Sequence, residues 1–288
     1  MTTPVPRASS ADLKKRLEQI VGERSPLTKP AHLRAVEDYI ETEFKRFGLS
    51  VESDQFVHER KSYRNIVGRL GSASGASLII LGAHFDSVPG SPGADDNASG
   101  VAVLLEAARI LSGLRLRSTV LFCAFNLEEL NMIGSAHFAQ RIKSHGFRVA
   151  AMVSLEMLGY TDSRPGSQKY PLGLSWFYPE RGDFIGLIGN WRSASLLKSF
   201  AGAMRQIAGL PVETLTVLGN GFLVPQVRLS DHAPFWDLGY SALLVTDTAF
   251  MRNPHYHGPS DIIDTLDLEF MSKVCQGVVN AVVTLARA

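Results

Sequence analysis

The stretch Leu78-Ile-Ile-Leu-Gly-Ala83, which runs directly into His84-Phe-Asp86, decides the fold. Its first six residues carry no charged or polar side chain, as expected of a central strand that is buried on both faces. The acidic stretch Gly93-Ala-Asp-Asp-Asn-Ala-Ser-Gly100 follows, and it leads into a segment in which apolar residues recur with helical periodicity. A buried strand that ends in polar residues and is followed by a helix is typical of an α/β fold.

The same alternation extends in both directions from this stretch. Apolar strands are predicted at 50–57, 65–70, 77–83, 120–125, 149–155, 184–188 and 241–245, and helices at 11–21, 31–47, 98–111, 132–143, 193–208 and 267–287. This order predicts an α/β three-layer sandwich, with a central, mostly parallel mixed sheet and helices on both faces. Because no linker interrupts it, we expect a single domain over 1–288, with a loop insertion at about 161–182.

Composition excludes several classes of protein. The 288 residues are 45% hydrophobic, which excludes a disordered chain. The 29 Lys and Arg nearly balance the 28 Asp and Glu, so the net charge gives no indication of binding to nucleic acid or to an anionic membrane. Cys123 and Cys275 cannot form a disulfide framework, and Cys123 lies in an apolar run, so we expect it to be buried. Residues 1–16 show no apolar signal-peptide core, which favours a cytoplasmic location.

Acidic and histidine residues follow the predicted strands. Strand 120–125 is followed by Asn-Leu-Glu128-Glu129, strand 149–155 by Glu156, and a loop near the end of the chain carries Pro254-His-Tyr-His257. In sheets of this kind, functional sites form at the carboxyl ends of the strands. Several carboxylates at one edge would destabilise each other's ionised forms. The pattern therefore predicts a metal site there.

Taken in order, these motifs resemble those of the co-catalytic zinc exopeptidases. That family includes bacterial leucyl aminopeptidases, glutamate carboxypeptidase II and glutaminyl cyclases. The resemblance covers roughly residues 35–288, and the segment 164–192 resembles the insertion of one bacterial branch of the family. The motifs that carry it are Gly82-Ala-His-Phe-Asp-Ser87, Gly93–Gly100, Glu128-Glu129, Glu156 and Tyr256-His-Gly-Pro-Ser-Asp261.

The resemblance implies two divalent metal ions, zinc in both positions, and one carboxylate shared between them. Asp96 matches the bridging carboxylate of the family. Glu129 and His257 match the remaining protein ligands of one ion, and His84 and Glu156 those of the other. Many aminopeptidases of the family carry Asp at the position of Glu156, and other members carry Glu. Zinc takes imidazole nitrogen and carboxylate oxygen readily, so these residue types suit the metal.

The resemblance also implies the catalytic roles. Glu128 matches the general base, which takes a proton from the attacking water and returns it to the leaving amine. Asp86 matches the residue that accepts the imidazole N–H of His84 and fixes its tautomer. Tyr256 matches a tyrosine that donates to the tetrahedral oxyanion.

The function implied is that of a metal-dependent exopeptidase, an aminopeptidase that hydrolyses N-terminal residues of peptide or aminoacyl substrates through a water activated by two metals. Two alternatives stay open. One is an acyltransferase similar to glutaminyl cyclases, with a single zinc held by Asp96, Glu129 and His257. The other is a non-catalytic binding protein on the same fold. The sequence leaves the oligomeric state undetermined.

Two further segments have two interpretations each. The first is Ser230-Asp231-His232. Either Ser230 caps a helix, or the segment forms a wall of the substrate pocket, with Asp231 as an acid that acts through the residues of the site. The aromatic residues of the insertion either attach that loop to the body or build an apolar pocket for the first substrate side chain. They are Tyr170, Trp176, Phe177 and Tyr178.

Overall fold

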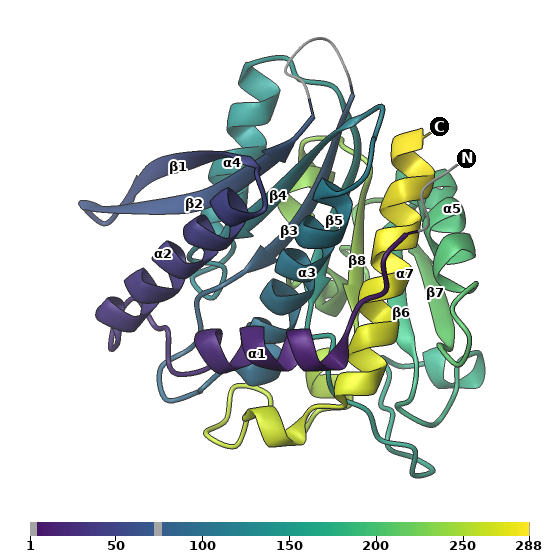
Figure 1. The fold of residues 1–288 in the computed structure, drawn as a ribbon. Helices are drawn as coiled ribbons and strands as arrows, with labels where there is room; N and C mark the ends of the chain where they lie inside the picture. The colour runs from purple at the N-terminus through teal and green to yellow at the C-terminus, as the bar shows by residue number, and fades with distance from the viewer. Residues whose placement is uncertain (1–4, 72–76, 288) are drawn as a thin grey trace.

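A single mixed sheet organises the molecule. The computed structural model describes residues 5–71 and 77–287, and its eight strands follow the order β1-β2-β4-β3-β5-β8-β6-β7 (Figure 1). Pairings β3–β4, β3–β5, β5–β8 and β6–β7 are parallel, and the other three are antiparallel. The predicted fold class is confirmed. The strands are β1 (Ser50–His58), β2 (Lys61–Leu70), β3 (Leu78–His84), β4 (Thr119–Phe125), β5 (Val149–Glu156), β6 (Ile185–Asn190), β7 (Val212–Val217) and β8 (Ala242–Thr246).

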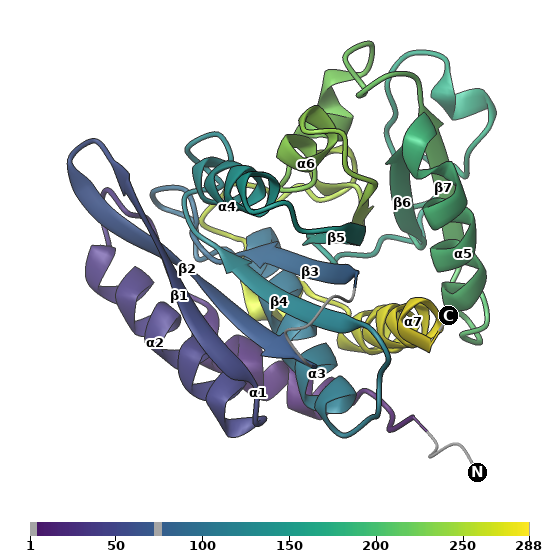
Figure 2. The same ribbon diagram turned by 90° about the horizontal axis from the view of Figure 1, so that it is seen from above.

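Helices cover both faces of the sheet (Figure 2). The larger hydrophobic core joins one face to α1 (Ser10–Ile20), α2 (Pro30–Arg46), α3 (Gly100–Ser112), α5 (Ala194–Met204) and α7 (Leu268–Arg287). A smaller core joins the other face to α4 (Ile133–Ser144) and the short α6 (Ala233–Asp237). Strand β3 contributes Ile79 and Leu81 to the first core and Leu78 and Ile80 to the second, so it is buried on both faces as predicted.

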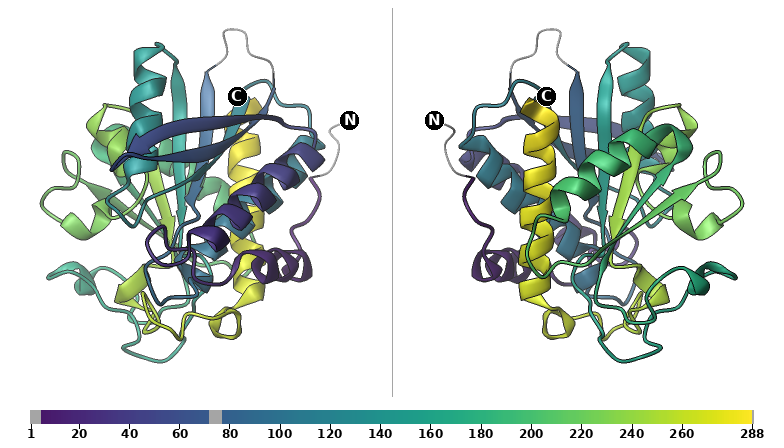
Figure 3. Two further views of the ribbon diagram at one scale, coloured as in Figure 1. Left: turned by 90° about the vertical axis from the view of Figure 1, so that its left-hand side faces the viewer. Right: turned by 90° about the vertical axis from the view of Figure 1, so that its right-hand side faces the viewer.

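The start of the described chain lies against the last helix. The backbone N–H of Ala8 donates to the Gln276 side chain of α7 at 2.9 Å. Helix α1, drawn in purple, lies beside α7, drawn in yellow, in both views of Figure 3. Helix α1 then begins at Ser10, because the Ser9 hydroxyl caps it by accepting the N–H of Asp12. Among the described residues, no helix combines the length and the apolar content needed to cross a membrane.

Several elements differ from the sequence-based expectation. Strand β7 was not predicted, and helix α5 ends at Met204 instead of 208. The predicted helix 98–111 is preceded by a π-helical turn, Ala94–Ser99, and α3 itself begins at Gly100. The segment 161–182 is irregular apart from a bridge between Asp162 and Gly182 and one 3-10 turn, Leu174–Trp176. Both cysteines are free and buried, as expected for Cys123.

Candidate metal centre

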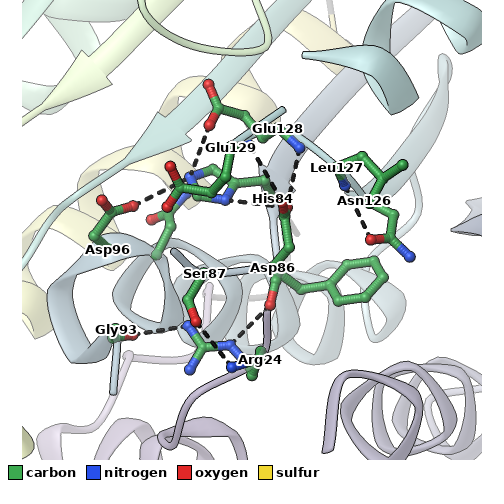
Figure 4. A network of polar contacts seen from close by, with 12 residues as sticks. Arg24, His84, Asp86, Ser87, Gly93, Asp96, Asn126, Leu127, Glu128 and Glu129 are labelled. Carbon is green, nitrogen blue, oxygen red and sulfur yellow. Dashed lines mark hydrogen bonds and ion pairs between the residues drawn. The ribbon is translucent and has the colours of Figure 1, made fainter. Parts of the chain in front are cut away.

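The strand ends bring the predicted residues together. His84 is the last residue of β3 and Glu156 the last residue of β5, while Glu128 and Glu129 follow β4 closely. Since β3, β4 and β5 run parallel, their carboxyl ends meet at one edge of the sheet. Asp96 reaches the same edge from the π-helical turn that precedes α3 (Figure 4).

Asp96 lies between two groups of metal-ligand type. Its Oδ1 is 3.3 Å from His84 Nε2, and its Oδ2 is 3.1 Å from His257 Nε2. Glu156 Oε1 lies 3.2 Å from His84 Nε2, and Glu129 Oε2 lies 3.2 Å from His257 Nε2. In each trio the candidate ligand atoms all lie within 4.8 Å of one another. A carboxylate whose two oxygens face two separate groups suits a bridging ligand.

The backbone around Asp96 is fixed by remote partners. The N–H groups of Asp95 and Asp96 donate to the two carboxylate oxygens of Asp261 at 2.9 and 3.1 Å. The peptide bond from Asp96 to Asn97 is cis. A Cβ at Gly100 would lie 2.3 Å from Asn97 Oδ1, which explains why glycine ends this motif.

Asp86 supports three residues of the site at once. Its carboxylate is fully buried and accepts the N–H groups of Glu128 and Glu129 at 3.0 and 3.1 Å. Its Oδ1 also lies 3.5 Å from His84 Nδ1. The carboxylate thus lies next to the imidazole, but no hydrogen bond to His84 Nδ1 is formed, and its role in fixing the tautomer stays a prediction. The two bonds to the Glu128-Glu129 backbone were not predicted.

Glu128 lies beside the cluster but outside the trios. Its Oε2 is 3.9 Å from His84 Nε2, and neither trio found among the described residues includes it. Burial raises the pKa of Glu128 well above its usual range, with a further rise from Glu156 and an opposing effect of His84. A carboxylate that is close to the ligands and holds a proton readily is suited to proton transfer.

The charges of the cluster fit a divalent cation. Burial and the neighbouring Asp96 raise the pKa of Glu129 to about 7. Burial lowers the pKa of His257, but hydrogen bonds with Asp96 and Glu129 outweigh that effect and raise it to about 10. Two buried atoms, His84 Nδ1 and Glu129 Oε1, have no hydrogen-bond partner among the described residues. Buried carboxylates and imidazoles with unsatisfied atoms form the oxygen and nitrogen donor set that zinc prefers.

A buried arginine, which the sequence did not indicate, lies under the site (Figure 4). Arg24 is 0% exposed. Burial lowers its pKa to about 10, while Asp96 and Asp86 act in the opposite direction, so the guanidinium is charged at neutral pH. Its five hydrogen bonds join the end of α1 to the loop that carries the acidic motifs; the acceptors are the carbonyls of Ile20, Gly22, Phe85, Pro92 and Gly93.

The loop after β8 places its two histidines, His255 and His257, in different surroundings. The ring of Tyr256 stacks on that of His257 with centroids 3.8 Å apart. Burial raises the pKa of Tyr256, so its hydroxyl keeps its proton. His255 instead lies with Nδ1 2.8 Å from Ser260 Oγ and belongs to neither trio found among the described residues. The geometry thus favours His257 over His255 as a ligand.

Ser230 contacts the cluster and does not cap the helix. Its hydroxyl donates to Glu156 Oε2 at 2.7 Å, whereas the N-cap residue of α6 is His232. The Asp231 carboxylate is fully buried, and neither oxygen has a hydrogen-bond partner in the described part of the chain. Burial raises the pKa of Asp231 to about 7, and His84 opposes this rise. The segment therefore acts behind the cluster through Ser230, but none of Ser230, Asp231 and His232 lines the cavity beside it.

A cavity of about 390 Å³ opens beside the cluster. Asp96, Glu128, Glu129, Glu156 and Tyr256 lie at one end of its lining, and much of the remaining lining is apolar. From the insertion, Tyr170 and Tyr178 line the cavity, whereas Trp176 and Phe177 are 85% and 79% exposed. Tyr170 and Tyr178 therefore fit the pocket interpretation, whereas Trp176 and Phe177 are too exposed to fit either interpretation.

The fold is similar to that of solved peptidase-like proteins. LapA aminopeptidase of Legionella pneumophila superposes with a TM-score of 0.78 at 21% identity, covering 98% of this chain and 73% of that one. Glutaminyl cyclase of Porphyromonas gingivalis superposes with a TM-score of 0.71 at 20% identity, covering 95% and 97%. At these identities the likeness concerns the fold alone.

Sequence relatives point to one family. "Uncharacterized protein YfbL" of Escherichia coli K12 is 36% identical over 273 residues, covering 88% of this chain and 83% of that one. Aminopeptidase YwaD of Bacillus subtilis is 30% identical over 209 residues, covering 71% and 40%. The chain spans 40–61% of the length of the relatives that are named as aminopeptidases or zinc metalloproteases. The model of peptidase family M28 matches residues 65–282, and the chain therefore belongs to peptidase family M28.

Proposed function

We propose that this chain is a single-domain, zinc-dependent aminopeptidase that removes N-terminal residues from peptides or aminoacyl compounds. The observation that carries the proposal is the position of Asp96, whose two oxygens face two separate trios of ligand type. Membership of peptidase family M28 supports it, as do relatives that are named as aminopeptidases and zinc metalloproteases.

In this proposal His84 and Glu156 would hold one ion together with Asp96. Glu129 and His257 would hold the second, with Asp96 as the ligand common to both. Zinc supplies Lewis acidity, which polarises a peptide carbonyl and lowers the pKa of water towards about 7. The complete trio around His84 favours two ions over the single zinc of an enzyme similar to glutaminyl cyclases.

The chain's own residues move and hold the protons. Glu128 takes the proton of the attacking water on its carboxylate and delivers it to the nitrogen of the leaving amine. Asp86 keeps the backbone of Glu128 in place and faces His84 Nδ1, so that Nε2 of the same ring turns its lone pair to the cluster. Tyr256, which keeps its hydroxyl proton, donates to the developing oxyanion.

The charges around the cavity favour a free amino terminus. All charged residues that line it in the described chain are carboxylates, and no Lys or Arg is among them. Glu128 and Glu156 are therefore placed to attract the α-ammonium of a substrate through charge-assisted hydrogen bonds. A carboxypeptidase would instead need a cation here to hold a C-terminal carboxylate.

Metal analysis and substrate blocking together test the proposal. Protein saturated with zinc should contain two ions per chain and should cleave leucyl-anilide but not its N-acetylated form. Glu128→Gln should keep both ions and lose about 10²–10⁴-fold in turnover. Glu129→Gln is the matched variant, which should lose zinc.

Three results would contradict the proposal. Equal rates on the free and acetylated anilides would exclude an aminopeptidase. One ion at saturation together with turnover of N-glutaminyl peptides would favour the cyclase chemistry. Near-full turnover of Glu128→Gln would show that another group is the base.

A further inference from the structure

Four residues form one row across the sheet, from the metal-ligand cluster to the far end of the cavity. Glu156 of β5 pairs with Thr246 of β8, Thr246 pairs with Gly186 of β6, and Gly186 pairs with Glu213 of β7. Residues that stand directly opposite one another on adjacent strands point to the same face of a sheet. All four line the cavity, and Glu156 and Glu213 stand at the two ends of this row.

The space between these two residues is bordered mainly by apolar groups. Gly186 contributes no side chain there, and a Cβ on it would lie 3.7 Å from Thr248 Cγ2 and 3.8 Å from Ile188 Cδ1. Ile188, Leu215 and Leu244 line the cavity from the same three strands.

Two aromatic rings of the insertion lie beside the Glu213 end. The rings of Tyr170 and Tyr178 stack with centroids 5.8 Å apart, and the Tyr178 hydroxyl donates to the carbonyl of Thr214, the residue after Glu213. Both tyrosines line the cavity. Apolar and aromatic groups therefore border the cavity between Glu156 and Glu213.

In the part of the chain that the structure describes, no cation is paired with Glu213. Among the described residues, no Lys, Arg or His lies within the 4.0 Å that defines an ion pair with its carboxylate. Burial raises the pKa of Glu213, and Arg205 opposes this only from a distance, since the Arg205 guanidinium donates to the Val212 carbonyl instead. The buried guanidinium of Arg252 is bonded to Gln168 and to the carbonyls of Tyr160 and Phe184, and its Nη2 has no partner among the described residues.

We propose that the aminopeptidase site selects substrates whose first residue is lysine or arginine, with the side-chain stem along the apolar walls and the terminal cation on Glu213. This inference rests on the proposed function, because it needs the α-ammonium to be held at the Glu156 end. An apolar first residue would fill the walls but leave the Glu213 carboxylate without a partner. A charge-assisted hydrogen bond at that end is worth more than one between neutral groups.

The dimensions agree with such a substrate. Three strand spacings of about 4.8 Å separate the Cα atoms of Glu156 and Glu213 by about 14 Å. An extended lysine places its α- and ε-nitrogens about 7 Å apart. One hydrogen bond of about 2.9 Å at each end extends that reach to about 13 Å.

The test compares lysyl-anilide with norleucyl-anilide, which has the same stem without the ammonium. We expect zinc-loaded protein to favour lysyl over norleucyl by at least about 10-fold in kcat/KM. Glu213→Gln should lower kcat/KM for lysyl-anilide about 10–100-fold and leave that for norleucyl-anilide within about 3-fold. Glu180→Gln, which removes an exposed carboxylate of the insertion, is the matched control and should change neither value.

A second variant keeps the charge and moves it. Glu213→Asp withdraws the carboxylate by one methylene, so the longer arginyl substrate should gain relative to lysyl. An unchanged ratio of lysyl to norleucyl rates in Glu213→Gln, or an unchanged ratio of arginyl to lysyl rates in Glu213→Asp, would overturn the inference. Hydrolysis of norleucyl-anilide as fast as lysyl-anilide by the unmodified protein would overturn it and leave the aminopeptidase function intact. Absence of turnover on every free N-terminus would refute that function itself.

Discussion

Replacement of Arg24 by lysine tests whether this one side chain holds the floor of the metal centre. The guanidinium of Arg24 makes five hydrogen bonds to backbone carbonyls. A lysine ammonium has three donors on a single nitrogen, so at least two of these carbonyls lose their partner. Each carbonyl left without a partner costs about 1–3 kcal/mol, which gives a loss of about 2–6 kcal/mol in the free energy of unfolding for Arg24→Lys.

Thermal unfolding measures this loss. In a domain of this size, each kcal/mol shifts Tm by about 2–4 °C, so Arg24→Lys should unfold roughly 5–20 °C below the unmodified protein. Arg46→Lys is the matched control. Arg46 is 69% exposed and forms an ion pair with Glu43, so the same substitution there should change the free energy of unfolding by at most about 1 kcal/mol. If Arg24→Lys shifted Tm no more than the control, the supporting role of Arg24 would be refuted.

Two further predictions concern the cluster itself. Asp86→Asn replaces one of the acceptors beside His84 by an amide NH₂, and zinc affinity measured by competition with a chelator should fall about 10–100-fold; an unchanged affinity would argue against this support. Burial raises the pKa of Glu129 from 4.5 to about 7, so the folded chain without zinc retains a proton that the unfolded chain releases above about pH 4.5. The free energy of unfolding of the zinc-free protein should therefore fall by up to about 3 kcal/mol between pH 4.5 and 7. In denaturant titrations, Glu129→Gln should reduce this dependence of stability on pH.

The strand ends made much of the site predictable from the sequence. His84 and Glu156 each end an apolar run, and the rule that sites lie at carboxyl ends of parallel strands was sufficient to bring them together. His257 could be distinguished from His255 only through the family pattern, because both lie in one irregular loop. Arg24 carried no signal, since its burial depends on a loop that folds around it from residues 85–93.

Strand β7 and the orientation of Glu213 could not be predicted from local sequence patterns. Val212-Glu-Thr-Leu-Thr-Val217 is short, and its apolar residues do not alternate strictly, so the period of two is weak. A half-buried glutamate in an edge strand is expected to face solvent, whereas Glu213 faces the cavity. Strand direction has no local signature either, and β6 runs antiparallel to β8.

The hydrogen bond from the Asp96 backbone to Asp261 spans 165 positions of the chain, and this separation has a consequence for biosynthesis. At about 5–20 residues per second, Asp261 is polymerised roughly 8–30 s after Asp96. During that interval the nascent chain already contains β3 and β4, but the acidic turn before α3 lacks its acceptor. Native pairings between such remote residues also form slowly, because loop closure precedes any gain in contacts. The metal centre is therefore among the last parts of the molecule to acquire its final structure, long after its first candidate ligand, His84, has been synthesised.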